Sequence, residues 1–314
     1  MISTSSPEVT RAVVIYHDNC CDGFGSAWSF YRLAASCYKD GVQYVPMSYG
    51  QLPDAEMITK DANITDVYIL DFSFSRQVLL EIAAYSASVT VLDHHKTAEE
   101  ALSNWPDKPS NLEIIFDQSR SGARISWEYF ADTPGTPQLI RYIEDRDLWR
   151  HEMTNTKELN ALIGFSKKEF SAYDALHNGF SMSYGNMVAQ GALLLESHQR
   201  HCSSIISATK REINICGYDG LVCNAPGQFA SDIGNTLALE SGTFGATYFQ
   251  ASDGSTKFSI RSIGDFDVTA IAKQFGGGGH KNAAGFVLHN QLDTAGVSLW
   301  NIESNHPGLM PLGT

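Results

Sequence analysis

Short apolar segments alternate with amphipathic segments along the first half of the chain. The apolar segments are rich in β-branched residues and are bounded by polar or turn residues, a pattern that predicts strands. They cover residues 11–16, 42–47, 66–71, 88–93 and 112–117. Helical periodicity follows at residues 25–35, 75–87 and 122–130. Strands that alternate with helices predict βαβ units, and near-continuous apolar strands are typical of a parallel sheet covered on both faces.

The pattern becomes helical after Pro137 and then returns to short β-like segments. Helices are expected at residues 137–149, 156–165 and 167–177, followed by one long helical segment at 184–213 and by β-like runs that end at residue 288. We therefore predict an α/β fold of two domains joined by a linking helix. The expected parts are a parallel-sheet domain at 1–183, the helix at 184–212, a smaller α/β domain at 213–300 and a non-periodic tail at 301–314.

The composition fits a globular protein with two cores. The chain has 314 residues, of which 43% are hydrophobic, and this length suits two ordinary domains. No apolar run reaches the ~18 residues of a membrane span. The first residues lack an apolar signal core, so we expect a cytoplasmic protein with no membrane partner. The six cysteines form no CxxC pair, which argues against a zinc knuckle or a disulfide framework. The pattern makes no prediction of oligomeric state.

The formal net charge of −13 limits the kinds of nucleic acid that this protein can bind. It argues against a long polyanion bound along an extended basic surface. A short oligonucleotide held by a few cations and by metal ions remains compatible with this charge, as does a carboxylate-rich metal site.

Carboxylate and imidazole side chains gather where the predicted strands end. Ligands of open α/β sheets bind beyond the carboxyl ends of the strands. A single Asp after a strand is usually a turn residue, so the prediction of a site rests on the co-location of several. The residues are His17, Asp18, Cys20 and Asp22 after the first strand, Asp71 after the third, Asp93, His94 and His95 after the fourth, Asp117 after the fifth, and Glu144, Asp145 and Asp147 near a later helix end.

This set of donor atoms indicates a divalent metal ion. Carboxylates and imidazoles suit Mn²⁺ or Mg²⁺, and converging carboxylates repel each other unless a cation neutralises them. Two ions ~3.5–4 Å apart serve phosphoryl displacement. Two of the acidic residues also have ordinary interpretations, because Asp117 can belong to a helix-capping loop and Asp145 can pair with Arg141 or Arg146.

A glycine-rich segment, "FGGGGHKNAAGF" at 275–286, marks the second domain. Consecutive glycines let the backbone approach a ligand closely, and a flexible loop is the ordinary interpretation. The spacing of a Walker loop is absent. The candidate phosphate contacts are Gly277, Gly278, Gly279, His280 and Lys281, together with Arg261 at the end of "KFSIRS".

Five motifs in this order resemble the DHH phosphoesterase superfamily, in which a DHH catalytic domain precedes an associated C-terminal domain. They are "YHDNCCDGFGSAW", "YILDFSF", "VLDHHKT", "YIEDRDLW" and "FGGGGHKNAAGF", and they cover nearly the whole chain. The resemblance implies cleavage of phosphodiester or phosphoanhydride bonds with two divalent ions, usually Mn²⁺, with Mg²⁺ or Co²⁺ as alternatives. Members include single-strand exonucleases, oligoribonucleases, cyclic-dinucleotide phosphodiesterases and inorganic pyrophosphatases.

The resemblance also implies a role for each site residue. Asp71 would bridge both ions, and His95 would face the scissile phosphate while Asp93 orients an imidazole. The remaining roles are Asp22, His94 and Asp147 as ligands of one ion, His17 as a ligand of the other, and His280 with its preceding glycines as the phosphate-gripping loop.

One position departs from the family pattern. Many relatives carry an Asp two residues before the Asp-Gly of the first motif, where this chain has Cys20. A thiolate is a softer ligand than a carboxylate and favours softer ions. Three alternatives follow: Cys20 ligates, Asp18 takes its place, or the first ion is bound weakly. We favour Cys20 at the site.

The predicted function is a metal-dependent phosphodiesterase that releases mononucleotides from short single-stranded oligonucleotides. The expected mechanism is in-line attack by a hydroxide that bridges the two ions. One alternative is a phosphatase or pyrophosphatase acting on small nucleotides, bisphosphates or cyclic dinucleotides. An alternative of another class is a non-catalytic module that senses nucleotides.

Overall fold

The structure, a computed structural model, describes residues 9–54 and 64–288. The chain divides into two compact units, Met1–Leu195 and Glu196–Thr314, and each is described by itself. The predicted α/β class is confirmed, with a parallel sheet in the first unit and a mixed sheet in the second. Within the described ranges, no helix is both long and apolar enough to cross a membrane.

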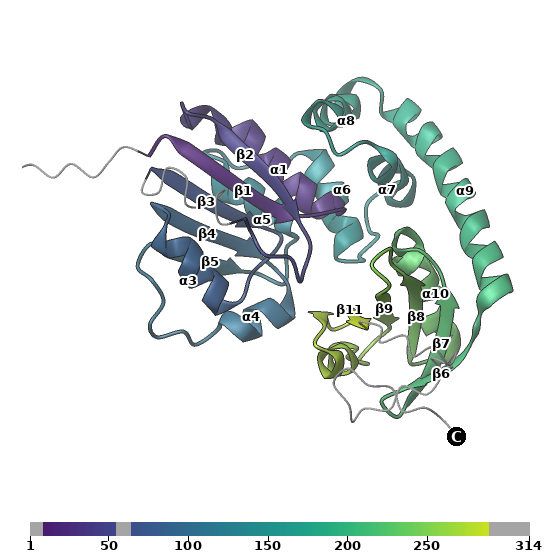
Figure 1. The fold of residues 1–314 in the computed structure, drawn as a ribbon. Helices are drawn as coiled ribbons and strands as arrows, with labels where there is room; N and C mark the ends of the chain where they lie inside the picture. Colours follow the sequence, from purple (N-terminus) through teal and green to yellow (C-terminus); the bar gives the residue numbers. More distant parts are fainter. Residues whose placement is uncertain (1–8, 55–63, 289–314) are drawn as a thin grey trace, which may run out of the picture. The chain divides into compact units, whose positions relative to one another are not determined.

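The first unit is built on a five-stranded parallel sheet in the order β2-β1-β3-β4-β5 (Figure 1). Its strands are β1 (Arg11–His17), β2 (Val42–Met47), β3 (Thr65–Leu70), β4 (Ser88–Asp93) and β5 (Leu112–Phe116). Every strand lies within one residue of its predicted bounds. Because neighbouring strands are all parallel, their carboxyl ends share one edge of the sheet, where the polar residues follow.

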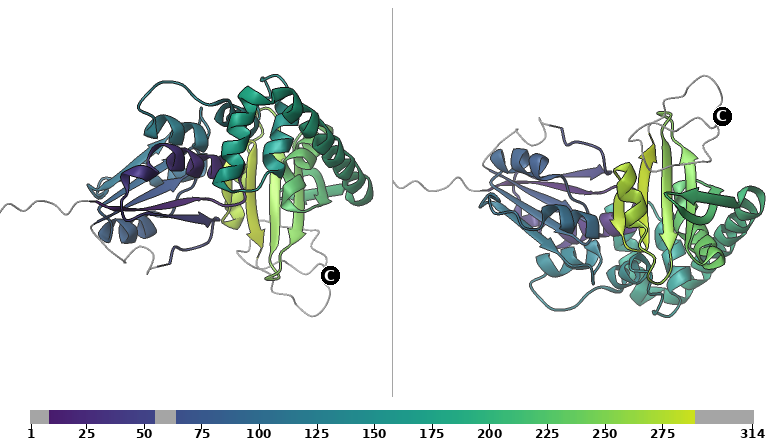
Figure 2. Two further views of the ribbon diagram at one scale, coloured as in Figure 1. Left: turned by 90° about the horizontal axis from the view of Figure 1, so that it is seen from above. Right: turned by 90° about the horizontal axis from the view of Figure 1, so that it is seen from below.

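Helices cover both faces of this sheet, as Figure 2 shows. They are α1 (Cys21–Leu33), α3 (Arg76–Ala84), α4 (Lys96–Leu102) and α5 (Gly122–Phe130). One face packs Leu79 and Ile82 of α3 against the strands, and the other face packs Phe30 of α1 and Ile125 of α5. Strands buried on both faces need apolar residues at successive positions, which explains the continuous apolar runs.

A helical layer completes the first unit. It consists of α6 (Gln138–Asp147), α7 (Thr156–Phe165), α8 (Phe170–Met182) and the start of α9 (Tyr184–Thr209). Its core surrounds the fully buried Trp28 and Tyr173. Helix α9 continues into the second unit.

The second unit has a six-stranded mixed sheet in the order β10-β11-β9-β8-β7-β6. The strands β7 and β8 are parallel, and the helix between them in sequence forms their crossover. The elements are β6 (Arg211–Ile215), β7 (Tyr218–Asn224), α10 (Ala230–Ser241), β8 (Phe244–Gln250), β9 (Thr256–Ser262), α11 (Thr269–Ala272), β10 (Gly278–His280) and β11 (Ala283–Leu288). The sequence pattern did not predict α4, α10, α11 or β10.

Candidate metal centre

Asp71 lies at the middle of a buried cluster, directly after β3. Its backbone is left-handed, with φ 55°, and its N–H donates to Leu92 O at 2.8 Å. The side chain is 1% exposed, and within the described ranges neither carboxylate oxygen accepts a hydrogen bond. One oxygen, Oδ1, lies 3.1 Å from His94 Nε2, and the other, Oδ2, lies 3.5 Å from His17 Nδ1. The carboxylate therefore presents one oxygen to each of two donor groups.

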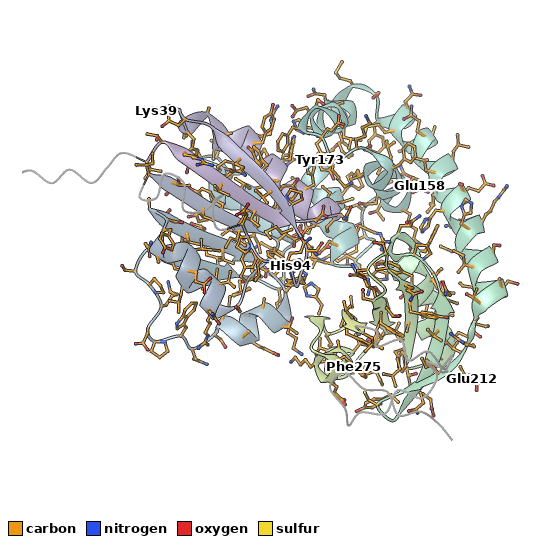
Figure 3. All side chains as sticks on the ribbon, viewed as in Figure 1. Lys39, His94, Glu158, Tyr173, Glu212 and Phe275 are labelled. Atoms are coloured by element: carbon orange, nitrogen blue, oxygen red, sulfur yellow. The ribbon has the colours of Figure 1, made fainter. Side chains whose placement is uncertain are left out.

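His94 forms the first donor group together with three carboxylates. Its Nε2 lies 3.1 Å from Asp71 Oδ1, 3.5 Å from Asp147 Oδ2 and 3.6 Å from Asp22 Oδ2. With metal–ligand bonds of about 2.1 Å, neighbouring ligand atoms lie about 3.0 Å apart in an octahedron and about 3.4 Å apart in a tetrahedron. The ligand atoms of Asp22, Asp71 and His94 also lie within 4.8 Å of one another, so these three residues fit part of a ligand shell around one divalent ion, and Asp147 approaches the same nitrogen of His94. Figure 3 labels His94 where the strands of the sheet end.

The start of α5 holds Asp22 in place. Asp22 belongs to the first turn of α1 and accepts hydrogen bonds from Gly122 N at 2.6 Å and Ala123 N at 3.0 Å. Free N–H groups at a helix N-terminus favour an anionic partner. Gly122 is also required by space, because a Cβ there would lie 2.5 Å from Asp71 Cβ. One helix end therefore positions two carboxylates.

The second donor group contains His17, Cys20 and Asp71. One ligand atom from each lies within 4.8 Å of the others. Asp18 is engaged elsewhere, because its carboxylate accepts from the backbone N–H and the side-chain amide of Asn19. Gly23 lets α1 approach β1, since a Cβ there would lie 2.2 Å from His17 O.

The Asp-His-His triplet divides its side chains between separate tasks. Asp93 is fully buried, and its Oδ1 accepts the backbone N–H groups of His94 at 2.7 Å and His95 at 3.2 Å. The same oxygen lies 2.7 Å from His95 Nδ1, so Asp93 orients that ring. The His95 ring meets the His17 ring edge-on, with centroids 5.7 Å apart.

Electrostatics in this cluster favour a bound cation. Burial raises the pKa of Asp22 well above its usual range, and the Asp71 and Asp147 carboxylates add to the effect. Burial alone would lower the pKa of His94, but the Asp147, Asp71 and Asp22 carboxylates raise it to about 11. Burial raises the pKa of the Cys20 thiol, and Asp71 adds to this. A divalent ion neutralises a group of converging carboxylates, of which Asp22 and Asp71 are buried, so the residues present fit a metal ion.

Three further acidic candidates lie outside the cluster: Glu144, whose Oε2 lies 3.5 Å from Arg124 Nη1, Asp117 and Asp145. Asp117 accepts from the backbone N–H and hydroxyl of Ser119 and pairs with Arg120 at 2.7 Å. Asp145 accepts from Glu152 N and from the Thr156 hydroxyl, and these partners differ from the expected arginines. The carboxylates of Asp117 and Asp145 therefore stabilise the loops that precede α5 and α7.

The glycine-rich segment of the second unit is a strand where the sequence suggested an open loop. Gly278–His280 form β10, which pairs with β11 at the edge of the sheet. Gly277 is required here because a Cβ would lie 2.1 Å from the backbone oxygen of Gly285. Two cationic candidates of this unit have acidic or polar neighbours: Lys281 Nζ lies 2.7 Å from Asp265 Oδ1, and Arg261 donates to the Ser231 hydroxyl at 3.0 Å.

Tyr49 also lies at this site, although the sequence pattern did not predict it there. This half-exposed residue follows β2, and its ring meets His17 and His95 edge-on, with centroids 5.6 Å and 5.7 Å away. The signal that identified the other residues, a polar position just after a strand, also applies to Tyr49. Gly122 was missed as a positioning residue because its neighbour Asp71 is distant in sequence, and Gly23 was missed because its contact with His17 depends on how closely α1 packs on β1.

Comparisons with known proteins found a family model, a curated relative and several solved structures that resemble this chain. A model of the DHHA1 domain matches residues 225–297. The uncharacterized protein R106 of Acanthamoeba polyphaga mimivirus is 33% identical over 290 residues, a match that covers 88% of this chain and 67% of that protein. Among solved structures, exonuclease RecJ bound to manganese has a TM-score of 0.48 at 13% identity, covering 90% of this chain and 86% of its own. The pGpG-specific phosphodiesterase PggH from Vibrio cholerae has a TM-score of 0.43 at 14% identity, covering 88% of this chain and 92% of its own.

The DHHA1 match in the second unit and the ordered motifs of the first define the class. The chain belongs to the DHH phosphoesterase superfamily, with a DHHA1 domain in its C-terminal unit. It is accordingly a DHH-family metal-dependent phosphoesterase, and the buried His and Asp groups around Asp71 are its candidate metal ligands.

Proposed function

We propose that this protein is a phosphodiesterase that hydrolyses short single-stranded oligonucleotides to mononucleotides, with two Mn²⁺ ions as cofactor and Mg²⁺ or Co²⁺ as alternatives. The observation that carries the proposal is the Asp71 carboxylate, which is buried, accepts no hydrogen bond within the described ranges, and turns one oxygen to His94 and the other to His17. When bound, such ions lower the pKa of a water molecule and neutralise charge on phosphoryl oxygens.

The metal-holding residues are preorganised. Asp22, His94 and Asp147 would hold one ion, His17 would hold the other, and Asp71 would contact both. Asp22 is anchored by two backbone N–H groups of α5, so its carboxylate keeps its position before any ion arrives. Ligands that keep their positions would hold the metal-bound water and the phosphate in the orientation that attack at phosphorus requires.

His95 is proposed to act on the scissile phosphate. Asp93 Oδ1 lies 2.7 Å from its Nδ1, which fixes the ring, and with both ring nitrogens protonated Nε2 would be the donor to a phosphoryl oxygen. A donor aimed at developing negative charge stabilises the transition state. Asp93 thus supports catalysis through His95.

The net charge favours a short substrate, and exposed aromatic rings favour one that carries bases. The net charge of −13 opposes long polyanions. Trp28 and Phe72 are at most 1% exposed, whereas Tyr49 is 50% and Trp149 is 36% exposed. The exposed parts of these last two rings are proposed to stack on bases, although the Arg146 guanidinium already lies 4.1 Å from the centre of the Trp149 ring. In the DHHA1 domain, the proposed phosphate contacts are Gly277, Gly278, Gly279, His280, Lys281 and Arg261.

Product analysis across a substrate panel tests this function. Metal-free protein is reloaded with Mn²⁺ and given labelled RNA and DNA of two to about 20 nucleotides, lengths that bracket the ~4–16 nucleotides of a single-strand groove. Mononucleotide release from the shortest RNA is expected. Asp71→Asn should lower the rate by about 10³-fold or more, because loss of a bridging ligand costs several kcal/mol of transition-state stabilisation.

The panel also contains a matched control and the competing substrates. Asp117→Asn changes a carboxylate that likewise follows a strand but bonds to Ser119 and Arg120, and it should keep wild-type rates. Faster hydrolysis of pyrophosphate, adenosine bisphosphate or cyclic dinucleotides would replace the proposed substrate class. Nucleotide binding without turnover under any divalent ion would instead indicate a sensing module.

A further inference from the structure

Cys20 occupies an unusual position beside the metal centre. It is the residue that precedes α1, and its side chain makes no hydrogen bond to the helix end, so the thiol has no capping role. Its neighbour Cys21 points elsewhere, with Sγ 3.4 Å from Lys168 Nζ. Cys20 instead groups with His17 and Asp71, whose ligand atoms lie within 4.8 Å of its sulfur.

Beside this sulfur lies the buried carboxylate of Asp71. Asp71 is 1% exposed, and neither of its oxygens accepts a hydrogen bond within the described ranges. A buried carboxylate needs a compensating positive charge. In the metal-free protein the imidazoles of His94 and His17 face its two oxygens, and a bound metal ion would take over this role. The sulfur, nitrogen and oxygen donors of Cys20, His17 and Asp71 therefore form a candidate metal site.

The two donor groups that share Asp71 differ in chemistry. The group around His94 offers three carboxylates and one imidazole, a set of hard donors that suits Mn²⁺ or Mg²⁺. The group around His17 offers a thiol, an imidazole and one carboxylate. Thiolate and imidazole ligands suit Zn²⁺ and other borderline or soft ions.

We propose that the centre is asymmetric: His17, Cys20 and Asp71 form a thiolate site for a softer divalent ion such as Zn²⁺ or Co²⁺, beside an oxygen-rich site for Mn²⁺ or Mg²⁺. On binding, the Cys20 S–H bond breaks, a sulfur–metal bond forms, and the proton leaves to solvent. This inference rests on the proposed two-ion function and specifies which ion each half selects.

Optical titration of the metal-free, full-length protein with Co²⁺ tests the asymmetry. A thiolate bound to Co²⁺ produces a charge-transfer band in the near ultraviolet, which oxygen and nitrogen ligands do not. The wild type should develop this band to an end point of one thiolate-bound Co²⁺ per chain. Elemental analysis after loading with Zn²⁺ and then Mn²⁺ should find one ion of each kind.

Three variants assign the band. Cys20→Ser and Cys20→Asp should both lose it, and Cys20→Asp should bind Mn²⁺ at both sites. Cys21→Ser is the matched control, because it removes the adjacent thiol that contacts Lys168, and it should keep the band. Removing a group that supports a ligand costs about 10–100-fold in metal affinity, so the loss of Zn²⁺ affinity in Cys20→Ser should be at least tenfold.

The outcomes separate this inference from the proposed function. A wild type that binds two Co²⁺ ions without a charge-transfer band overturns the asymmetry, as does a band that survives in Cys20→Ser or disappears in Cys21→Ser. A correct band with no hydrolysis of any oligonucleotide overturns the substrate class and leaves the asymmetry standing. Hydrolysis of oligonucleotides with Mn²⁺, without a charge-transfer band in the Co²⁺ protein, overturns the asymmetry and leaves the substrate class standing.

Discussion

Gly122→Ala perturbs the centre through one added methyl group. The new Cβ would lie 2.5 Å from Asp71 Cβ and 2.6 Å from Asp71 Oδ1. Carbon atoms in contact lie about 3.5–4.0 Å apart, so either Asp71 or the start of α5 must move by about 1 Å. Because Gly122 N also donates to Asp22 Oδ2 at 2.6 Å, movement of α5 displaces a second carboxylate.

The size of the effect follows from this displacement. A misplacement of about 1 Å at a reacting centre can cost about 10²-fold in rate, and overpacking a filled interior costs about 1–3 kcal/mol of unfolding free energy. We expect Gly122→Ala to lower kcat by about 10²-fold, to weaken Mn²⁺ binding and to reduce stability within that range. Calorimetric Mn²⁺ titration, chemical denaturation and oligonucleotide hydrolysis measure the three effects.

Gly164→Ala is the matched control. Gly164 lies in α7, and an added Cβ there meets no atom within 4 Å. Alanine in an exposed helix is favoured over glycine by about 0.5–1 kcal/mol, so this variant should be slightly more stable and fully active. Wild-type Mn²⁺ affinity and kcat in Gly122→Ala would refute the argument that the start of α5 sets the geometry of Asp71.

Three further experiments, one on proton release and two on substitutions, probe the residues around Asp71. The pKa of His94 is raised from 6.5 to about 11, so its stabilising contribution to the metal-free protein is complete below pH 6.5 and is lost as pH rises toward 11. Because His94 is therefore protonated at pH 8, Mn²⁺ binding at this pH should release about one proton or more. Binding enthalpies that do not vary with the ionisation heat of the buffer would contradict this. Asp93→Asn should lower kcat by about 10–100-fold with metal content unchanged, because Asp93 acts by orienting His95, and elemental analysis beside steady-state kinetics checks both parts. Tyr49→Ala should raise KM for oligonucleotides while Tyr49→Phe keeps it near wild type, since the ring and not the hydroxyl faces His17 and His95; equal KM values in the two variants would exclude stacking.

The parallel sheet was predictable because its strands are buried on both faces. Such strands carry apolar residues without interruption, so their bounds are visible in the sequence, as for β4 at Ser88–Asp93. Helix α10 (Ala230–Ser241) was missed because glycine, asparagine and serine interrupt its apolar stripe. Strand β10 was missed because its glycines predict a loop, whereas Gly277 and Gly279 serve close contact with β11.

The members of the site were easier to predict than its geometry. Asp22, Asp71 and His94 follow strands or start helices, which the sequence shows, and the structure brings their ligand atoms within 4.8 Å of one another. The sequence does not reveal which oxygen of Asp71 faces which histidine, or that α5 anchors Asp22. Those facts depend on contacts between residues that are far apart in the chain, the longest being the 100-residue separation of Asp22 and Gly122.

The most direct test of the metal centre is an anomalous difference map from crystals grown with saturating Mn²⁺. Two peaks about 3.5–4 Å apart are expected, one on each side of the Asp71 carboxylate. One peak should lie beside His94, Asp22 and Asp147, and the other beside His17. Crystals with no peak at Asp71, or with Mn²⁺ bound only at distant surface carboxylates, would contradict the assignment of this cluster as the catalytic metal centre.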